Sequence, residues 1–281
     1  MRVLAMLDGT LADPDQPHIR VDDLGLTRGD GIFETILVVD GKPRELEPHL
    51  DRLARSAAML DLPEPDRAAW TTCAQAVIDN WTGSAELALK LVYTRGIDGG
   101  DGTPTGFALG MEIAPNALHQ RANGIAAITL DRGIEPGAVQ RAPWLLLGAK
   151  SLSYAVNMAA GREAARRHAD EAIFTEAGGE YILEGPTSTV VVAEGQTLRT
   201  PPSGIGILPG TTQAALFRAA EKAGWATKVE PVRVADLRAA DAVLMVSSVR
   251  KVTRVHTLDG QALTDSTALH AELLALYEAE Y

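Results

Sequence analysis

The order of strand-like and helix-like segments constrains the fold of this chain more than any other feature. Apolar runs of strand length, such as residues 31–39 and 86–94, are mixed irregularly with stretches that have helical spacing, such as residues 47–60. The segments therefore lack the strand–helix–strand rhythm of a doubly wound parallel sheet. This order predicts an α+β fold.

The first part of the chain contains hairpin turns and helical stretches. An Asp-Gly pair follows each of the apolar runs 2–7 and 31–39, and this pair is typical of a hairpin turn. Apolar residues at helical spacing predict a helix over 47–60, and a second helix is predicted at about 66–81. Further strands are predicted at 86–94 and 105–113, with a Gly-rich loop between them.

The polar stretch 116–124 predicts a boundary between subdomains. We therefore expect an N-terminal subdomain at 1–116 and a C-terminal subdomain at 117–281. In the second part, helices are predicted at about 154–168, before Gly224 and at the chain's end. Strands are predicted at 125–130, 171–176 and 180–183, and in the runs STVVVA, AVLMVSSV and KVTRVHT.

Composition excludes several classes of protein. The 281 residues suit two subdomains, and a formal net charge of −11 argues against a nucleic-acid or anionic-membrane partner. Cys73 is the single cysteine, so no intrachain disulfide and no cysteine-based zinc site can form, and no metal site is predicted. The N-terminus does not resemble a signal peptide, and no apolar run approaches the roughly 20 residues of a membrane helix. These features predict a soluble, cytoplasmic protein.

Lys150 is the lysine most suited to covalent chemistry among only six. It follows PWLLLGA and precedes SLSYA, an apolar setting that would lower the pKa of an amine and make it nucleophilic. The alternative is a lysine at a strand end whose amine reaches solvent. Lys90, in ELALKLVY, has a similar setting and is a rival.

The segment 206–212, GILPGTT, leads directly into a predicted helix. Backbone N–H groups and hydroxyls at a helix N-terminus bind phosphate well, although this is not a Walker motif because no lysine follows the glycine. A plain threonine cap after a Gly-Pro turn is the alternative. Ser247 and Ser248, at the end of an apolar strand, can add hydroxyls to the same anion or be ordinary strand-end residues.

Two charged residues complete a possible site. Arg52 lies three residues after His49 on one helix face and could bind phosphate through both guanidinium nitrogens, or pair with a surface carboxylate such as Glu47 or Asp51. Glu184 ends the run YILE and is either a solvated loop residue or aimed at a heterocycle nitrogen. An amine, a phosphate cradle, an arginine and such an acid are together what one cofactor, a phosphorylated pyridine aldehyde, requires.

These blocks resemble the fold-type IV family of pyridoxal-phosphate enzymes. The resemblance runs from LGLTRGDGIFET through PHLDRL, AKSLSY and YILEGPTST to GILPGTTQ, in the family's order. GAKSLSYAVNM with LEGPTSTVV looks most like aminodeoxychorismate lyases. The resemblance implies a smaller N-terminal α/β sandwich, a larger barrel-like C-terminal domain, pyridoxal 5'-phosphate as cofactor and a homodimer.

The resemblance also implies residue roles. Lys150 would carry the cofactor as a Schiff base, and Glu184 would pair with its pyridine nitrogen. Tyr154 would lie near its phenolic oxygen. The phosphate contacts would come from Arg52, Thr211, Thr212 and Ser248, and the substrate side from Phe33 and Thr35.

Two positions depart from the family pattern. The family usually has asparagine five residues after the glutamate, and here Thr189 stands there, whose hydroxyl still offers a hydrogen bond to the cofactor pocket. The loop RGIDGGDGTP carries one arginine, Arg95, where many lyase relatives have a second and D-amino-acid aminotransferases have an Arg-x-His carboxylate trap. Arg95 is the substrate-side candidate, and recognition of the substrate carboxylate stays open.

Three hypotheses follow for the activity. The first is a 4-amino-4-deoxychorismate lyase that forms pyruvate and 4-aminobenzoate, a folate precursor, with Lys150 as base and acid. The second is a class IV aminotransferase that uses the same lysine on branched-chain or D-amino acids. The third is a non-catalytic α+β binding protein, in which the motif residues are only structural.

Overall fold

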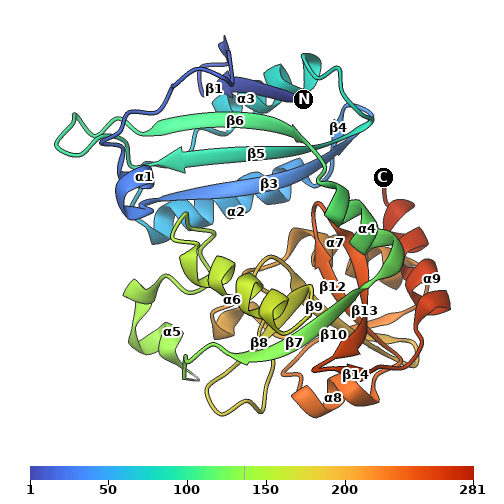
Figure 1. The fold of residues 1–281 in the computed structure, drawn as a ribbon. Helices are drawn as coiled ribbons and strands as arrows, with labels where there is room; N and C mark the ends of the chain where they lie inside the picture. Colours follow the sequence, from blue (N-terminus) through green and yellow to red (C-terminus); the bar gives the residue numbers. More distant parts are fainter. Residues whose placement is uncertain (136) are drawn as a thin grey trace. The chain divides into compact units, whose positions relative to one another are not determined.

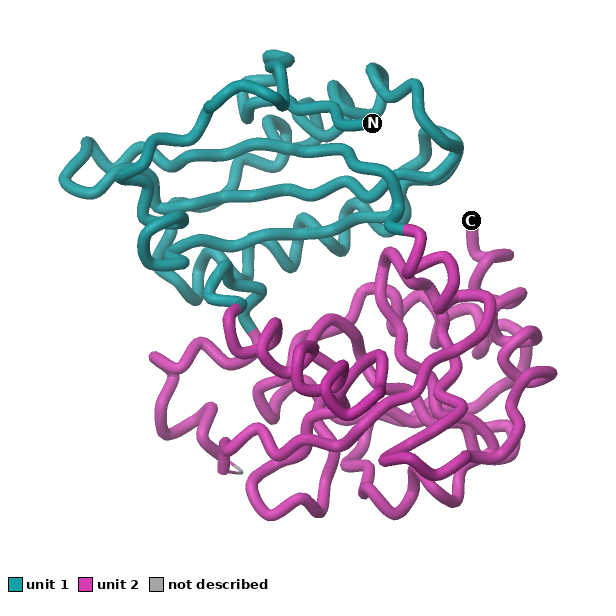
Figure 2. The backbone as a smooth tube through the Cα atoms, viewed as in Figure 1, with its two compact units in different colours: residues 1–114, 149–154 teal, residues 115–148, 155–281 magenta. Residues whose placement is uncertain are grey.

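The computed structural model describes residues 1–135 and 137–281 and divides them into two compact units. Unit 1 comprises Met1–Ala114 and Ala149–Tyr154, and unit 2 comprises Pro115–Gly148 and Ala155–Tyr281 (Figure 2). The predicted division lay between residues 116 and 117. The prediction placed residues 149–154, which include Lys150, in the C-terminal subdomain, whereas the structure places them in the first unit.

Unit 1 is an antiparallel sheet with two long helices packed on it (Figure 1). The strand order is β2-β1-β6-β5-β3-β4. Helix α2 packs on β3, and α3 packs on β1, β5 and β6. The elements are β1 (Arg2–Met6), β2 (Leu11–Ala12), α1 (Leu24–Arg28), β3 (Gly31–Val39), β4 (Lys42–Pro43), α2 (Leu46–Met59), α3 (Arg67–Asp79), β5 (Glu86–Thr94) and β6 (Thr105–Glu112).

Local chemistry explains why these elements form where the sequence predicts them. Asp40 and Gly41 both have positive φ angles, of 48° and 75°, as the tight turn between β3 and β4 requires. Asp66 caps α3 by accepting hydrogen bonds from the N–H groups of Ala68 and Ala69. The predicted hairpins and both predicted helices of this part are therefore confirmed.

Unit 2 contains an eight-stranded mixed sheet. Its path is β11-β10-β9-β12-β13-β7-β8, and β14 pairs with β13. The parallel pair β7–β8 is joined through α6, so the unit holds a strand–helix–strand crossover within an otherwise irregular order. Its strands are β7 (Ile125–Asp131), β8 (Glu171–Thr175), β9 (Thr189–Glu194), β10 (Thr197–Thr200), β11 (Ala226–Val229), β12 (Ala242–Ser247), β13 (Lys251–Leu258) and β14 (Gln261–Ala262). Its helices are α4 (Pro115–Asn123), α5 (Ala138–Arg141), η1 (Pro143–Leu145), α6 (Ala155–Arg166), η2 (Ser203–Ile205), α7 (Thr211–Lys222), α8 (Val234–Ala239) and α9 (Thr267–Glu278).

The interior of strand β9, residues 190–193, is apolar because both faces of the strand are buried. Val191 packs in a cluster with residues of α7 and α9, such as Leu216 and Leu273. Its neighbours Val190 and Val192 point to the opposite face and join a second cluster. Unit 2 is thus built from two apolar layers on one sheet, and the prediction of an α+β fold is confirmed.

The structure differs from the sequence prediction at two places. Most of residues 116–124, the polar stretch at which a boundary was predicted, form helix α4, whose buried side chain is Gln120; the first segment of unit 1 ends just before this helix, at Ala114. The predicted strand at 180–183 is reduced to single bridges of Tyr181 and Ile182 to their neighbours. Both segments are short, so neighbouring elements decided their conformation. Among the described residues, no helix is long and apolar enough to cross a bilayer.

Candidate functional site

Lys150 lies in a segment that runs alongside strand β3 in unit 1. The backbone N–H of Phe33 donates to the Lys150 carbonyl at 3.0 Å, and that of Leu152 donates to Gly31 at 2.8 Å. The Lys150 N–H donates to Ser56 Oγ of α2 at 3.1 Å. These bonds fix the backbone of Lys150 at the free edge of β3, next to residues predicted for the substrate side.

The Lys150 amine lies over an aromatic ring. Its Nζ is 4.5 Å from the centroid of Phe33 and 5.9 Å from that of Tyr154, and the two rings meet edge to face at 5.2 Å. The side chain is half-buried. Lys150, Phe33 and Tyr154, which were selected from the sequence, are therefore brought together by the fold.

Lys90 joins the same group from β5. It is the cross-strand partner of Thr35, and its Nζ lies 5.0 Å from the Phe33 centroid. Burial lowers the pKa of this amine. In the sequence Lys90 is only a rival to Lys150, whereas the structure places both amines beside one phenyl ring. Two cations near a hydrophobic wall suit an anionic substrate.

Arg52 is buried in an ion pair rather than exposed. It donates to both oxygens of Glu34, from Nε at 2.8 Å and from Nη2 at 2.6 Å, and His49 Nδ1 lies 2.7 Å from Glu34 Oε2. All three side chains are at least nine-tenths buried. The surface partners named as an alternative, Glu47 and Asp51, pair instead with Arg67. That alternative is wrong because Glu34, from the neighbouring strand, faces α2.

The charges of this buried group are coupled. Burial opposes ionisation of Glu34, but the adjacent Arg52 and His49 outweigh it and hold the pKa of Glu34 far below its usual range. Burial also lowers the pKa of His49; Glu34 opposes this shift, while Arg52 and Lys150 add to it. The fold thus holds a carboxylate and a guanidinium together beneath the Lys150 segment.

In unit 2, Glu184 is oriented by two groups. Its Oε1 lies 3.3 Å from Nη1 of Arg132, and its Oε2 accepts a hydrogen bond from the Leu208 N–H at 2.9 Å. Arg132 Nη1 also donates to the Gly206 carbonyl at 3.2 Å. The sequence did not indicate a role for Arg132. Its one distinguishing feature there is that it directly follows β7, and its partner Glu184 is 52 residues away along the chain.

The start of helix α7 lies against strand β9. A Cβ atom placed on Gly210 would come within 2.3 Å of Thr189 Oγ1, so only glycine allows this approach. Gly210 has no side chain with which to cap the helix, and Thr211 and Thr212 behind it are buried. Backbone N–H groups at such an N-terminus, with threonine hydroxyls beside them, suit a phosphate.

Ser248 belongs to the same end of the sheet. Thr189 pairs with Val246 in the antiparallel β9–β12 ladder, and Ser248 follows two residues later. Strand β9 therefore begins where β12 ends, beside the start of α7. Sheet topology thus gathers Glu184, Thr189, Thr211, Thr212 and Ser248 at one end of unit 2.

Arg95 is engaged elsewhere in unit 1. It forms an ion pair with Asp30 at 2.7 Å and donates to the carbonyls of Leu60 and Asp61 at 2.5 and 3.1 Å. The hydrogen bond to Asp30 raises the pKa of Arg95. These contacts join three segments of unit 1, so Lys90 is better placed than Arg95 beside Phe33 and Lys150.

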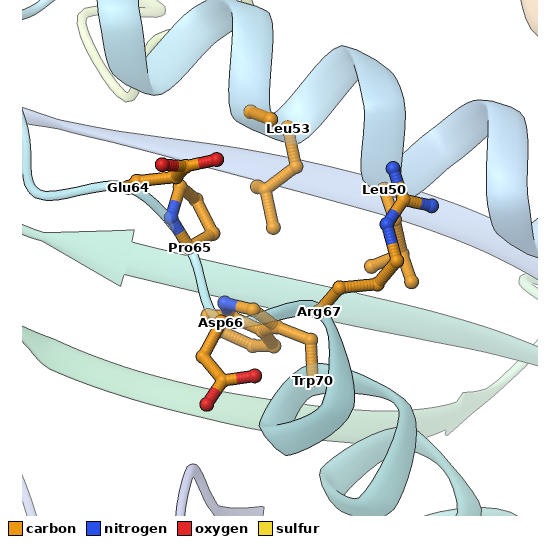
Figure 3. Close-up of a pocket in the computed structure, with 8 residues that line it drawn as sticks. Leu50, Leu53, Glu64, Pro65, Asp66, Arg67 and Trp70 are labelled. Atoms are coloured by element: carbon orange, nitrogen blue, oxygen red, sulfur yellow. The ribbon is translucent and has the colours of Figure 1, made fainter.

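Unit 1 also has a pocket of about 340 Å³ between α2 and α3 (Figure 3). Leu50 and Leu53 line it from α2, and Arg67 and Trp70 line it from α3. None of the residues selected from the sequence lines this pocket, and we assign no reaction to it.

Known proteins match this chain over almost its whole length. The family model of amino-transferase class IV matches residues 31–258. A bifunctional aminodeoxychorismate lyase / D-amino acid transaminase of Mycobacterium tuberculosis is 43% identical over 97% of each chain. A hypothetical aminotransferase from M. tuberculosis in its PLP-bound form is 43% identical with a TM-score of 0.94, covering 99% of this chain and 98% of that one.

A third match bears on the fold class. A fold IV-transaminase from Curtobacterium pusillum is 45% identical, with a TM-score of 0.93 over 99% of each chain. The predicted resemblance and the predicted fold-type IV architecture are therefore confirmed. The chain belongs to the class IV aminotransferase family.

Proposed function

We propose that this chain is a pyridoxal-5'-phosphate enzyme that cleaves 4-amino-4-deoxychorismate to 4-aminobenzoate and pyruvate, and that it also transaminates. The observation that carries the lyase activity is the pair of amines beside Phe33: Lys150 at 4.5 Å and Lys90 at 5.0 Å from one ring centroid. The first amine suits covalent chemistry, and the second suits a carboxylate. The relative with both activities in its name is 43% identical.

The donors of unit 2 fit the phosphate of this cofactor. Gly210 permits close packing of the α7 N-terminus on Thr189, and buried threonine hydroxyls follow it. Thr211 and Thr212 would hold the phosphate together with Ser248, while Glu184 would hold the proton on the pyridine nitrogen. Arg132 orients Glu184 for this task. Arg52, fixed by Glu34, would be a further phosphate contact.

Pyridoxal 5'-phosphate supplies an aldehyde that joins covalently to amines and a ring that withdraws electrons. Lys150 Nζ would hold the cofactor until the substrate amine replaces it. The freed Lys150 amine would then take the proton from the substrate ring carbon that bears the amine, and would return a proton when the enolpyruvyl group leaves as pyruvate. Tyr154 and Phe33 would orient the lysine through their rings.

Lys90 favours a substrate with an additional carboxylate. Aminodeoxychorismate carries one carboxylate on its ring and another on its enolpyruvyl group. Lys90 lies on the same sheet face as Phe33 and Thr35, and its partial burial strengthens an ion pair with an incoming anion. It therefore supplies the carboxylate-binding cation that the loop around Arg95 lacks.

Transamination is the second candidate activity. Its support is the 45% identity to a fold IV-transaminase and the D-amino acid transaminase activity in the name of the M. tuberculosis relative. Both reactions use the same lysine to remove a proton next to the substrate nitrogen. They differ in where the proton is returned, so one site can support both.

A two-substrate assay tests this ranking. The purified holoenzyme is incubated with aminodeoxychorismate without a keto acid, and 4-aminobenzoate and pyruvate are measured. We expect equal amounts of the two products at a kcat/KM above that for D-alanine with 2-oxoglutarate. Transamination of D- or branched-chain amino acids without release of 4-aminobenzoate would reverse the ranking.

A homodimer and a cytoplasmic location stay predictions. Unit 2 exposes several large apolar side chains on η1 and α6, of the kind that an oligomer covers. These are Trp144, Leu145, Val156 and Met158.

A methyl group at Gly210 tests the phosphate cradle. In Gly210→Ala the new Cβ would meet Thr189 Oγ1 at 2.3 Å, so either the Thr189 side chain must turn away or the α7 N-terminus must move away from β9, and both changes disturb the cradle. We expect the cofactor Kd, measured by absorbance titration of the apoenzyme, to rise at least about tenfold, because 1.4 kcal/mol of lost binding is a factor of ten. Gly204→Ala is the control, since nothing lies within 4 Å of that Cβ. Unchanged binding by Gly210→Ala would remove the cradle from the proposed site.

A further inference from the structure

A second buried ion pair lies in unit 2 outside the residues discussed so far. Glu171 begins β8, and Arg250 ends the turn 248–250 that follows β12. Arg250 Nη2 pairs with Glu171 Oε2, and the two side chains are only 11% and 5% exposed. A buried pair of this kind adds little net stability over apolar packing, so its value lies elsewhere than in the free energy of folding.

The Glu171–Arg250 ion pair also forms hydrogen bonds with the loop 184–188, which connects Glu184 to β9. Glu171 Oε1 accepts hydrogen bonds from Ser188 Oγ at 2.9 Å and from Thr187 Oγ1 at 3.2 Å. Arg250 Nη2 donates to Thr187 Oγ1 at 3.4 Å. Thr187 therefore contacts both members of the ion pair, and the loop 184–188 is joined to the turn 248–250 through side chains.

Further contacts hold the loop 184–188 and the turn 248–250. A Cβ on Gly185 would come within 2.4 Å of both Met245 Cε and Ser188 Oγ. Asn157 of α6 donates to the Pro186 carbonyl at 2.7 Å. On the other side, Arg121 of α4 donates to the Val249 carbonyl, with Nε at 2.8 Å. The ion pair thus lies between two segments that are each held by a helix.

We propose that Arg250 is a positioning residue which, through Glu171 and Thr187, holds the loop that begins at Glu184 in register with the turn that carries Ser248. The inference rests on the proposed function, in which Glu184 meets the pyridine nitrogen and Ser248 the phosphate of one cofactor. These two ends of the cofactor are a fixed distance apart. The network sets the spacing of the protein groups that must match them.

The test compares Arg250→Met with Arg199→Met. Arg199, on β10, is a matched control because its side chain is 15% exposed and pairs with the acids of Glu194, Glu230 and Asp236, away from both segments. Apoenzymes are titrated with pyridoxal 5'-phosphate by absorbance, and their thermal unfolding is measured separately. We expect both variants to unfold at lower temperature, and only Arg250→Met to bind the cofactor about 10–100-fold more weakly, as when a group that orients a ligand is lost.

Two further variants separate a positioning role of Arg250 from a general loss of folding stability. Arg250→Lys keeps a cation for Glu171 and is expected to recover most of the lost affinity. Thr187→Val keeps the size of the side chain but removes the hydroxyl that contacts both Glu171 and Arg250. We expect weaker cofactor binding. We also expect a changed visible spectrum of the bound cofactor, since in the proposed site Glu184 pairs with the pyridine nitrogen. If Arg250→Met does not fold, Thr187→Val alone decides.

The measured cofactor affinities decide between the positioning role of Arg250 and its absence. Wild-type affinity in Thr187→Val and Arg250→Met, or an equal loss of affinity in Arg199→Met, would overturn the positioning role. Failure of the wild-type apoenzyme to bind pyridoxal 5'-phosphate would overturn the proposed function instead, so the two failures are distinguishable.

Discussion

Lys150→Ala is expected to abolish the visible absorbance of the lysine-bound cofactor and to lower kcat/KM by at least about a thousandfold. In the proposed reaction this variant loses both the amine that would join the cofactor and the base that would move the substrate proton; general acid–base catalysis alone contributes roughly 10²–10⁴-fold. The backbone of residue 150 keeps its hydrogen bonds to Phe33 and Ser56, so the fold should survive. The measurements are an absorbance spectrum after cofactor loading and the two-substrate assay.

Lys90→Gln is the matched control, because Lys90 lies beside the same ring. We expect this variant to keep the lysine-bound absorbance and to raise KM for aminodeoxychorismate by about tenfold, the value of one charge-assisted contact near 1.4 kcal/mol. If Lys90→Gln rather than Lys150→Ala lost the absorbance, the roles of the two lysines would be exchanged. A Lys150→Ala protein with normal turnover would refute the covalent role altogether.

Glu34→Gln is expected to lower the free energy of unfolding by about 3–5 kcal/mol, because it leaves the Arg52 guanidinium buried without an anion. Glu34 is completely buried, and Arg52 donates to both of its oxygens. Urea unfolding monitored by fluorescence measures the loss. Cofactor affinity should fall as well, since Arg52 would no longer be held in one orientation.

Glu47→Gln is the control for this experiment. Glu47 also pairs with an arginine, Arg67, but that pair is exposed to solvent. We expect its unfolding curve to coincide with that of the wild type, because water screens an exposed pair. Equal losses in the two variants would show that burial does not set the importance of the Glu34 pair.

The same group predicts how stability depends on pH. The pKa of Glu34 is lowered in the folded protein, so its ionised form stabilises the fold above its ordinary pKa of 4.5, and that contribution is lost as the pH falls further. The pKa of His49 is lowered as well, so below its ordinary value of 6.5 the unfolded chain binds a proton that the folded protein does not. Stability should therefore begin to fall below about pH 6.5 and fall further below about 4.5. In Glu34→Gln the second decline should be smaller.

Local features of this protein were determined by the sequence alone. The tight β3–β4 turn requires positive φ angles at two residues, and Asp40 and Gly41 both tolerate them. This turn could therefore be predicted without any knowledge of its surroundings. The spacing of Leu50, Leu53 and Ala57 likewise predicts the buried face of α2. The motif blocks around Lys150 and Glu184 identified the family, because residue type and order along the chain carry that information.

Tertiary structure alone decided which charged and polar groups meet. Arg52 and Glu34 are 18 residues apart, Arg132 and Glu184 are 52 apart, and the Lys150 N–H finds Ser56 across 94 residues. Such pairings depend on which strands and helices become neighbours and on how deeply each charge is buried. The sequence therefore determined the elements, through interactions between nearby residues, and it singled out Lys150 as the candidate for covalent chemistry. The partners that orient the charged groups were chosen by packing, because a buried charge is stable only beside the opposite charge that the folded chain brings to it.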